Sequence, residues 1–210
     1  MKSDRPTMRS SGTKTLLKDT FLEMLKKIPF SRIRVTELCR RAHVTRGTFY
    51  AHYVDIYALL EDVMQDAMIF LDSITDRNCC ESFDDLWEVA RQNNLAAFKA
   101  YNDRLPPCYR LIDIPKYRPL MQDDDLASLL VQRIFDKERK FLVPFLMKRQ
   151  GVSEFIAENI FWYVVNGSMA VNKRIGWCKN QHWYELQLQL LRFALGGYDS
   201  IGPEGTVGKK

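Results

Sequence analysis

The chain has 210 residues, a length that fits one large domain or two small ones. Its apolar fraction of 46% is enough to build a hydrophobic core, which argues against a globally disordered protein. No apolar run approaches the roughly 18 to 20 residues that span a bilayer, and the N-terminal stretch MKSDRPTMRSSGTK lacks a signal peptide's apolar segment. We therefore expect a cytoplasmic protein without a membrane partner.

The net charge of +5 is unevenly distributed. Residues 1–60 hold 12 Lys and Arg against 5 Asp and Glu, a balance of +7, whereas the remaining 150 residues hold 19 against 21, a balance of −2. A basic segment joined to a nearly neutral one is typical of a nucleic-acid-binding module with a second domain. The alternative is a chance excess in a solvated basic tail.

The five cysteines are an odd number, and no two have the spacing C-x-x-C. Cys79 and Cys80 are adjacent, and their spacing to Cys108 and Cys178 does not suit a metal chelate. We expect reduced thiols, no metal site and no cofactor.

The N-terminal elements begin with a polar arm over residues 1–12, which we expect to be disordered. The first helix is predicted over 13–27, because its apolar residues recur on one face. These residues are Leu17, Phe21, Met24, Leu25 and Ile28. Pro29 ends the helix, since the residue before a proline resists helical geometry.

Two short helices joined by a turn are predicted next, over residues 34–53. The first spans about 37–42 with Thr36 as its N-cap, and the second spans 46–52 with Thr45 as its N-cap. His43 and Val44 form the turn between them. Asp55 then caps a longer helix whose apolar residues continue to Ile74.

The rest of the chain also has helical periodicity, with a break over residues 78–83. We predict helices over about 84–101, 124–149, 153–177 and 180–195, with a proline-rich irregular connection between the first two. Pro144 should kink or split the helix that contains it. Because no strand alternation is present, the predicted fold is all-α. Its predicted parts are a helix-turn-helix domain over 13–60, a helical regulatory and dimerisation domain over 61–197, and a flexible tail over 198–210.

The segment 45–53 carries residues that suit a helix inserted into the major groove of DNA. Arg46 can bond bidentately to guanine or pair with a phosphate. Gly47 lowers helix propensity, and close approach of the backbone to DNA is a reason to have it. Phe49 and Tyr53, four residues apart, are interpreted as ordinary core aromatics facing inward.

Over about residues 13–65 the chain resembles the TetR family of bacterial transcriptional regulators. The matching residues are Val35, Thr36, Glu37, Leu38, Arg41, Ala42, Val44, Thr45, Arg46, Gly47, Thr48, Phe49, Tyr50, His52, Tyr53, Leu59 and Leu60. The resemblance implies phosphate or base contacts from a subset of these. That subset is Thr36, Thr45, Arg46, Gly47, Thr48, Tyr50 and His52. It also implies a homodimer on a pseudo-palindromic operator and a small-molecule effector bound by the second domain.

Two residues depart from the family's pattern. His43 stands in the turn where the family usually has Gly, and Ile56 stands where it usually has Lys. If the turn needs a positive φ, His is one of the better residues other than Gly. Ile56 cannot contact a phosphate through its side chain, so DNA affinity is expected to be lower or to depend more on Arg32, Arg34 or the N-terminal arm.

The predicted helix over 180–195 has an apolar arc of roughly 220°, about twice the usual core stripe. We therefore expect two buried faces, one of them in a dimer, although a large monomer core is an alternative. Aromatic and amide side chains in the second domain are candidates for a ligand pocket or for plain core. They are Trp87, Phe98, Tyr101, Trp162, Tyr163 and Asn166.

Three functions are compared on these patterns. A ligand-responsive homodimeric repressor agrees with the charge distribution and the predicted helix-turn-helix. A helical adaptor or co-activator that binds a protein is the alternative suggested by His43 and Ile56. An enzyme is not expected, because no nucleophile, phosphate-binding or dinucleotide-binding motif is present.

Overall fold

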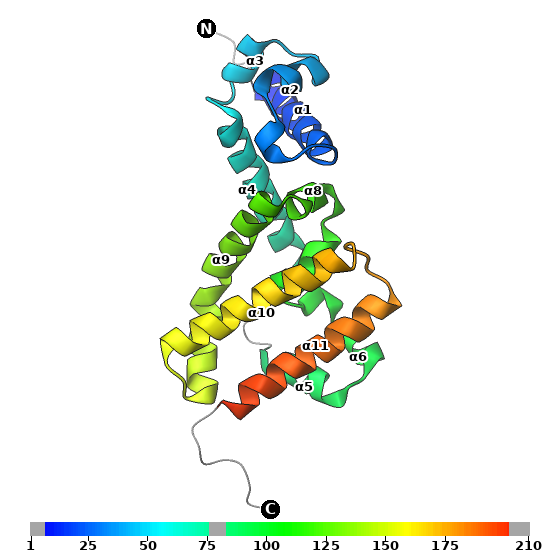
Figure 1. The fold of residues 1–210 in the computed structure, drawn as a ribbon, viewed down its shortest axis with the longest axis vertical. Coiled ribbons are helices and arrows are strands. Elements are labelled where there is room, and N and C mark those ends of the chain that lie inside the picture. Colours follow the sequence, from blue (N-terminus) through cyan, green and yellow to red (C-terminus); the bar gives the residue numbers. More distant parts are fainter. Residues whose placement is uncertain (1–6, 76–82, 202–210) are drawn as a thin grey trace, which may run out of the picture. The chain divides into compact units, whose positions relative to one another are not determined.

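The computed structural model describes residues 7–75 and 83–201 (Figure 1). Within these ranges the secondary structure is helical and contains no strand. This confirms the predicted all-α class. The first elements are α1 (Thr7–Leu25), η1 (Phe30–Arg32), α2 (Val35–Arg41), α3 (Arg46–Tyr50) and α4 (Ile56–Ile74).

The second half of the described chain contains short helices followed by three long ones. The short elements are α5 (Phe83–Gln92), α6 (Leu95–Ala100), η3 (Asn102–Arg104), α7 (Pro107–Arg110), η4 (Leu111–Asp113), η5 (Pro115–Tyr117) and α8 (Arg118–Gln122). The long ones are α9 (Asp124–Gln150), α10 (Glu154–Arg174) and α11 (Gln181–Ser200). The proline-rich connection predicted as irregular therefore consists of single helical turns.

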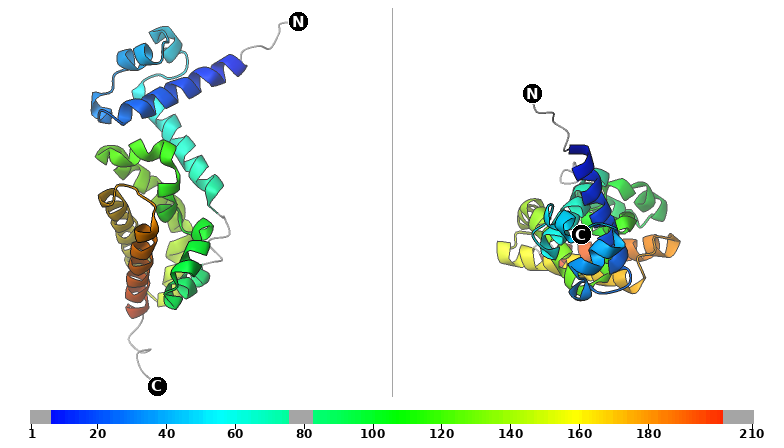
Figure 2. Two further views of the ribbon diagram at one scale, coloured as in Figure 1. Left: turned by 90° about the vertical axis from the view of Figure 1, so that its right-hand side faces the viewer. Right: turned by 90° about the horizontal axis from the view of Figure 1, so that it is seen from above.

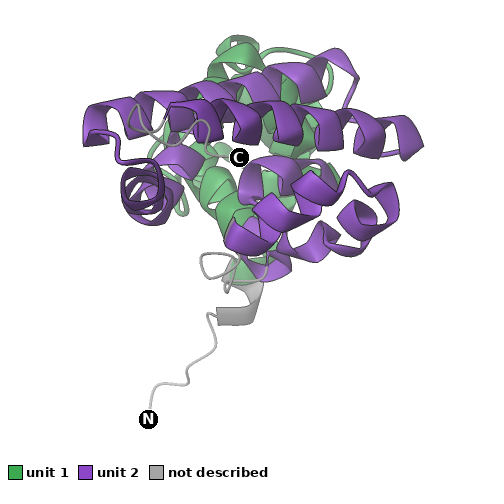
Figure 3. Cartoon of the chain, turned by 90° about the horizontal axis from the view of Figure 1, so that it is seen from below, with its two compact units in different colours: residues 1–69, 115–130 green, residues 70–114, 131–210 purple. Residues whose placement is uncertain are grey.

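The chain divides into two compact units (Figure 3). Unit 1 comprises Met1–Ile69 and Pro115–Leu130, and unit 2 comprises Phe70–Ile114 and Val131–Lys210. This division differs from the predicted boundaries 13–60 and 61–197, because residues 115–130 return to the N-terminal unit. Asp123 shows why: its carboxylate accepts a hydrogen bond from the Phe30 backbone N–H at 2.8 Å.

The core of unit 1 forms where α1 packs against α2 and α8, and α2 packs against α3. Its centre contains Leu17, Phe21, Leu38, Phe49 and Leu59, all fully buried. The predicted apolar face of the first helix is thus confirmed over Leu17 to Leu25.

Unit 2 is built around α10 and α11, which lie side by side and run in opposite directions (Figures 1 and 2). α11 packs against α5 and α6, and α10 packs against α7. Side-chain hydroxyl and amide oxygens cap the long helices: Ser153 accepts from the Ile156 backbone N–H, and Asn180 accepts from that of Trp183. The predicted starts of both helices are therefore confirmed.

Several element boundaries differ from the predictions for local reasons. α1 begins at Thr7, so residues 7–12 of the expected arm are helical, while residues 1–6 lie outside the described part. The predicted helix over 84–101 is broken at Asn93, which adopts a positive φ of 49°, and Asn94 caps α6. α9 is not split at Pro144, because buried Val143 and Leu146 on either side hold the helix in the core.

The C-terminal tail also begins later than predicted. α11 continues to Ser200, so residues 198–200 of the expected tail are helical. Residues 202–210 lie outside the described part of the chain, as does most of the predicted break over 78–83.

Candidate nucleic-acid interface

The turn between α2 and α3 is a Schellman motif centred on His43. The Val44 backbone N–H donates to the Cys39 carbonyl at 3.0 Å, and His43 has a φ of 53°. This geometry is the one in which a helix usually ends at Gly, because Gly tolerates positive φ without strain. The sequence-based inference about His43 is therefore confirmed, and the turn stores some backbone strain.

Thr45 caps α3, as predicted. Its Oγ1 accepts a hydrogen bond from the Thr48 backbone N–H at 3.0 Å and lies 2.9 Å from the Thr48 hydroxyl. Thr45 is in the extended conformation expected of an N-cap residue. The cap fixes the two hydroxyls beside each other at the first turn of α3.

The outer surface of α3 is formed by the residues predicted to contact DNA. Thr45, Arg46, Gly47 and Tyr50 are exposed, and Thr48 and His52 are half-buried. The Arg46 guanidinium lies over the Tyr50 ring, 5.9 Å from its centroid, and among the described residues it has no carboxylate partner. Six of the seven predicted contact residues are thus brought together on one short stretch of chain.

Gly47 lies on this surface with space around its Cα. A Cβ placed there would meet only the Thr45 Oγ1, at 3.7 Å, which is ordinary van der Waals contact. The φ of Gly47 is not one that favours glycine. Since neither strain nor crowding inside the chain explains a glycine here, any requirement for it comes from outside the chain.

Thr36 is the seventh predicted contact residue, and its predicted role as a cap is wrong. Arg34 is the N-cap residue of α2, and Thr36 lies exposed within the first helical turn. The helix begins earlier than predicted because Val35 already adopts helical geometry, and the Leu38 backbone N–H donates to the Arg34 carbonyl.

The Glu37 carboxylate pairs with two arginines on the outer face of α2. Glu37 accepts hydrogen bonds from Arg40 at 2.8 and 2.9 Å and from Arg41 at 2.7 Å. These hydrogen bonds lower the pKa of Glu37 to about 2. The basic excess of the N-terminal segment is therefore partly neutralised on α2, whereas the cation on α3 is not.

The inner face of α3 is apolar, as predicted. Phe49 is fully buried and Tyr53 is 4% exposed. The Tyr53 hydroxyl donates to Asp62 of α4 at 2.7 Å, and Asp62 also pairs with Lys14 and Lys18 of α1. Burial, followed by the hydrogen bond to Asp62, raises the pKa of Tyr53. This polar group ties the segment after α3 to both long helices of unit 1.

α4 begins with Ile56, so its first turn carries no cationic side chain, as the sequence indicated. Asp55 accepts a hydrogen bond from the Ala58 backbone N–H at 2.8 Å, which confirms its predicted capping role. Val54 and Tyr57 are 81% and 66% exposed beside it. Together with the half-buried Ile56, they present apolar groups next to the outer surface of α3.

The candidate pocket residues of the second domain do not form one site. Trp87, Phe98 and Tyr101 are buried, Trp162 is half-buried, and Tyr163 and Asn166 are exposed. The Asn166 side chain donates to the Trp162 carbonyl one turn back in its own helix. Of these six residues, Trp87 alone lines the apolar cavity that α5, α7, α9, α10 and α11 enclose.

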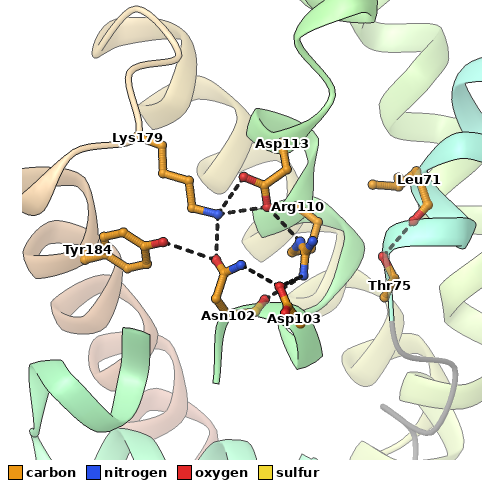
Figure 4. Close-up of polar contacts among 8 residues, drawn as sticks. All are labelled: Leu71, Thr75, Asn102, Asp103, Arg110, Asp113, Lys179 and Tyr184. Carbon is orange, nitrogen blue, oxygen red and sulfur yellow. Dashed lines mark hydrogen bonds and ion pairs between the residues drawn. The ribbon is translucent and has the colours of Figure 1, made fainter. Parts of the chain in front are cut away.

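A charged cluster that the sequence patterns did not reveal joins residues 102–113 to the loop before α11 (Figure 4). The Lys179 ammonium donates to both carboxylate oxygens of Asp113, at 2.6 and 2.8 Å. The buried Arg110 donates to the Asn102 carbonyl and to Asp103. Burial lowers the pKa of Lys179, and the Asp113 carboxylate opposes this. Two cations face two carboxylates, so the cluster is internally balanced and serves to hold the loop.

Other kinds of site are sparse in the described residues. They contain no group of three or more His, Cys, Asp or Glu side chains arranged to hold a metal ion. None of their helices combines the length and the apolar character needed to cross a bilayer. Comparison with protein-family models found no match to the chain, and comparison with curated proteins found none either.

Proposed function

We propose that the chain is a sequence-specific DNA-binding regulator of transcription, a homodimeric repressor of the TetR type that acts in the cytoplasm and responds to a small effector. The observation that carries this proposal is the outer surface of α3. There a guanidinium, a tyrosine and an unhindered glycine backbone lie exposed, with an exposed and a half-buried hydroxyl beside them, while Phe49 of the same helix is buried.

The chemistry of this surface suits a DNA groove. Arg46 lacks a carboxylate partner among the described residues, so its guanidinium is available for a guanine edge or a phosphate. The paired hydroxyls of Thr45 and Thr48 can contact phosphates or base edges. The unhindered Gly47 allows the helix backbone to approach closely. Thr36, Tyr50 and His52 are proposed to add contacts at the edges.

A homodimer is proposed through the outer faces of α10 and α11. Five large apolar side chains are exposed there: Phe155, Ile156, Tyr163, Leu186 and Phe193, at 75%, 43%, 69%, 36% and 72%. Isolated exposed apolar residues are common, but a monomer rarely leaves this many on two adjacent helices. A twofold pair would place two copies of α3 on half-sites roughly 34–36 Å apart.

Selection from random double-stranded DNA tests the proposal. We expect enrichment of a pseudo-palindromic sequence, with affinity that falls steeply as salt concentration rises. Arg46→Ala should cost about 1–3 kcal/mol of specific binding and relax the preference at one base position. Failure to enrich any sequence, or binding that is insensitive to salt, contradicts the proposal.

The Gly47→Ala variant distinguishes an effect on DNA affinity from an effect on the stability of the fold. Alanine should raise the stability of α3 by up to about 1 kcal/mol, because it has the higher helix propensity and meets no crowding inside the chain. The same methyl group would face the DNA, so affinity should fall while thermal stability does not. A variant that binds as tightly as the parent excludes close approach at this position.

A helical adaptor that binds protein is the second candidate function. The exposed Val54 and Tyr57, next to Ile56, favour it, because a DNA phosphate gains nothing from apolar groups at this position. The same selection distinguishes the two functions. If no DNA sequence is enriched, substitution of Tyr57 by Glu should then abolish capture of the protein partner.

A further inference from the structure

Two amide side chains are completely buried between α10 and α11. Asn172 of α10 and Gln187 of α11 are both 0% exposed. The Trp183 indole Nε1 donates to the Asn172 Oδ1 at 2.8 Å, and the Gln187 Nε2 donates to the same oxygen at 3.2 Å. One oxygen therefore accepts both hydrogen bonds.

The orientation of the pair follows from this arrangement. An indole N–H can only donate, so the group of Asn172 that faces Trp183 must be its oxygen, and the group of Gln187 that faces that oxygen must be its amide nitrogen. The Asn172 Nδ2 and the Gln187 Oε1 are then left without a hydrogen-bond partner among the described residues. A donor and an acceptor thus lie unused on two adjacent side chains.

Unpartnered polar groups that are fully buried destabilise a fold and are rare in natural proteins. The unpartnered donor, Asn172 Nδ2, and the unpartnered acceptor, Gln187 Oε1, can both be satisfied by a single group that accepts one hydrogen bond and donates another. A hydroxyl, a primary amide or a water molecule has this property. A carboxylate or an ammonium ion does not, and it would also introduce a buried charge.

An apolar cavity follows the amide pair along α10 and α11, and its lining residues do not include Asn172 or Gln187. Because α10 and α11 run antiparallel, the contact between Asn172 and Gln187 places Ser168 opposite Leu191 and then Val164 opposite Leu195. Each step is one turn, roughly 6 Å for four residues at 1.5 Å each. Val164, Leu191 and Leu195 all line the cavity.

The cavity has a volume of about 50 Å³ and an uncharged lining. Its walls include Trp87, Tyr109, Phe161 and Leu191. The buried Ser168 lies one turn from Asn172 along α10, between Asn172 and Val164 of the cavity wall. The cavity and the amide pair therefore follow one another along α10 and α11.

We propose that the cavity and the amide pair form one binding site for a small uncharged molecule with a short apolar chain and a terminal primary amide or hydroxyl. The terminal group bonds to Asn172 Nδ2 and Gln187 Oε1, and the chain enters the cavity. A water molecule at the pair would have two partners rather than the usual three or so and would leave the cavity unfilled. Binding itself is independent of DNA; only its regulatory effect rests on the proposed function.

The test uses the full chain and two probes of equal length, butanamide and butanoate. Butanamide should raise the melting temperature in a saturable manner at concentrations on the order of millimolar, given the ceiling on binding energy for so few atoms. Butanoate should not, because its carboxylate cannot donate and carries a charge. No saturable shift with butanamide overturns the proposal.

Gln187→Met tests the polar end, because methionine has a similar length and lacks the acceptor. It should weaken butanamide binding about tenfold or more. Gln189→Met, two residues further along α11 on its exposed side, is the matched control and should bind like the parent. If Gln187→Met instead raises the melting temperature and the parent binds no probe, the pair holds an internal water only, and the proposal fails.

Ala194→Met tests the apolar end and leaves both amides intact. Ala194 lines the cavity and is half-buried, so a longer side chain can fill the space without disturbing the core. Binding should be lost, and this variant serves if Gln187→Met does not fold. Unchanged binding in a folded Ala194→Met variant would separate the cavity from the site and overturn the proposal.

The two proposals fail independently. If butanamide binds and no DNA sequence is enriched, the site stands and the regulator is excluded. If a DNA sequence is enriched and butanamide does not bind, the regulator stands and the site is excluded.

Discussion

The Tyr53 hydroxyl and the Asp62 carboxylate, 2.7 Å apart, connect the end of the α3 segment to α4. Asp62 also pairs with Lys14 and Lys18, so the same carboxylate reaches α1. Tyr53 is buried and follows α3 by three residues. This contact therefore fixes the chain that leaves α3, the helix that carries Arg46 and Thr48.

Tyr53→Phe should destabilise unit 1 by about 1–2 kcal/mol, since it removes a hydrogen bond to a charged acceptor and leaves Asp62 partly unsatisfied. Thermal unfolding followed by circular dichroism measures this loss. Tyr50→Phe is the control, because Tyr50 is 49% exposed. It should leave stability unchanged and weaken DNA binding. Equal stability of the two variants would contradict the role given to Asp62.

The Glu37 cluster predicts a dependence of stability on pH. The folded pKa of Glu37 is lowered from 4.5 to about 2, so the carboxylate stabilises the fold above its ordinary pKa. This contribution should be lost as the pH falls from about 4.5 to about 2. Urea unfolding of the parent and of Glu37→Gln at several pH values measures it. The difference between them should shrink over this window; a constant difference would show that the hydrogen bonds to Arg40 and Arg41 add nothing.

His43→Gly should stabilise the chain. Relief of the left-handed conformation is worth roughly 1–2 kcal/mol, and the more flexible unfolded glycine costs about 0.4–1 kcal/mol of that, which leaves about 0.5–1 kcal/mol. His43→Val should have the opposite sign, because a β-branched residue tolerates positive φ worst. Chemical denaturation of both variants checks the pair. A glycine variant less stable than the parent would mean that the His43 side chain makes a compensating contact.

Phe193→Glu should convert a homodimer to a monomer, since it places a charge in the proposed apolar interface. Light scattering after gel filtration measures the mass. Ile69→Glu is the control: Ile69 is 57% exposed on α4 and belongs to neither helix of the proposed interface, so its replacement should leave the mass unchanged. A parent chain that is already monomeric would refute the proposed assembly.

Local features of the fold could be predicted because each depends on a few neighbouring residues. The cap formed by Thr45, the positive φ of His43 and the inward face of Phe49 all follow from short-range geometry and helical spacing. The limits of α2 and α6 could not be predicted as well. Arg34 has no typical capping side chain, and nothing in the periodicity distinguishes Asn93 from an ordinary helical residue.

The interior of unit 2 was harder to predict for a different reason. Helical spacing shows that a helix has two apolar faces but not which one is covered, so it does not distinguish the exposed Tyr163 from the fully buried Phe98. The sequence gives no signal for the burial of Asn172 and Gln187, because polar residues in a helix usually face solvent. Their burial depends on antiparallel pairing of α10 with α11, which single-helix patterns do not contain.

The hydrogen bond from Phe30 to Asp123 has a practical consequence for dissecting the molecule. Asp123 also accepts from the Leu126 backbone N–H, so one carboxylate secures both η1 and the start of α9. Unit 1 thus consists of two chain segments with 45 residues of unit 2 between them. A protease cut or a stop codon after α4 would not release a complete N-terminal module. A chimera that transplants this module must carry both segments to inherit its stability.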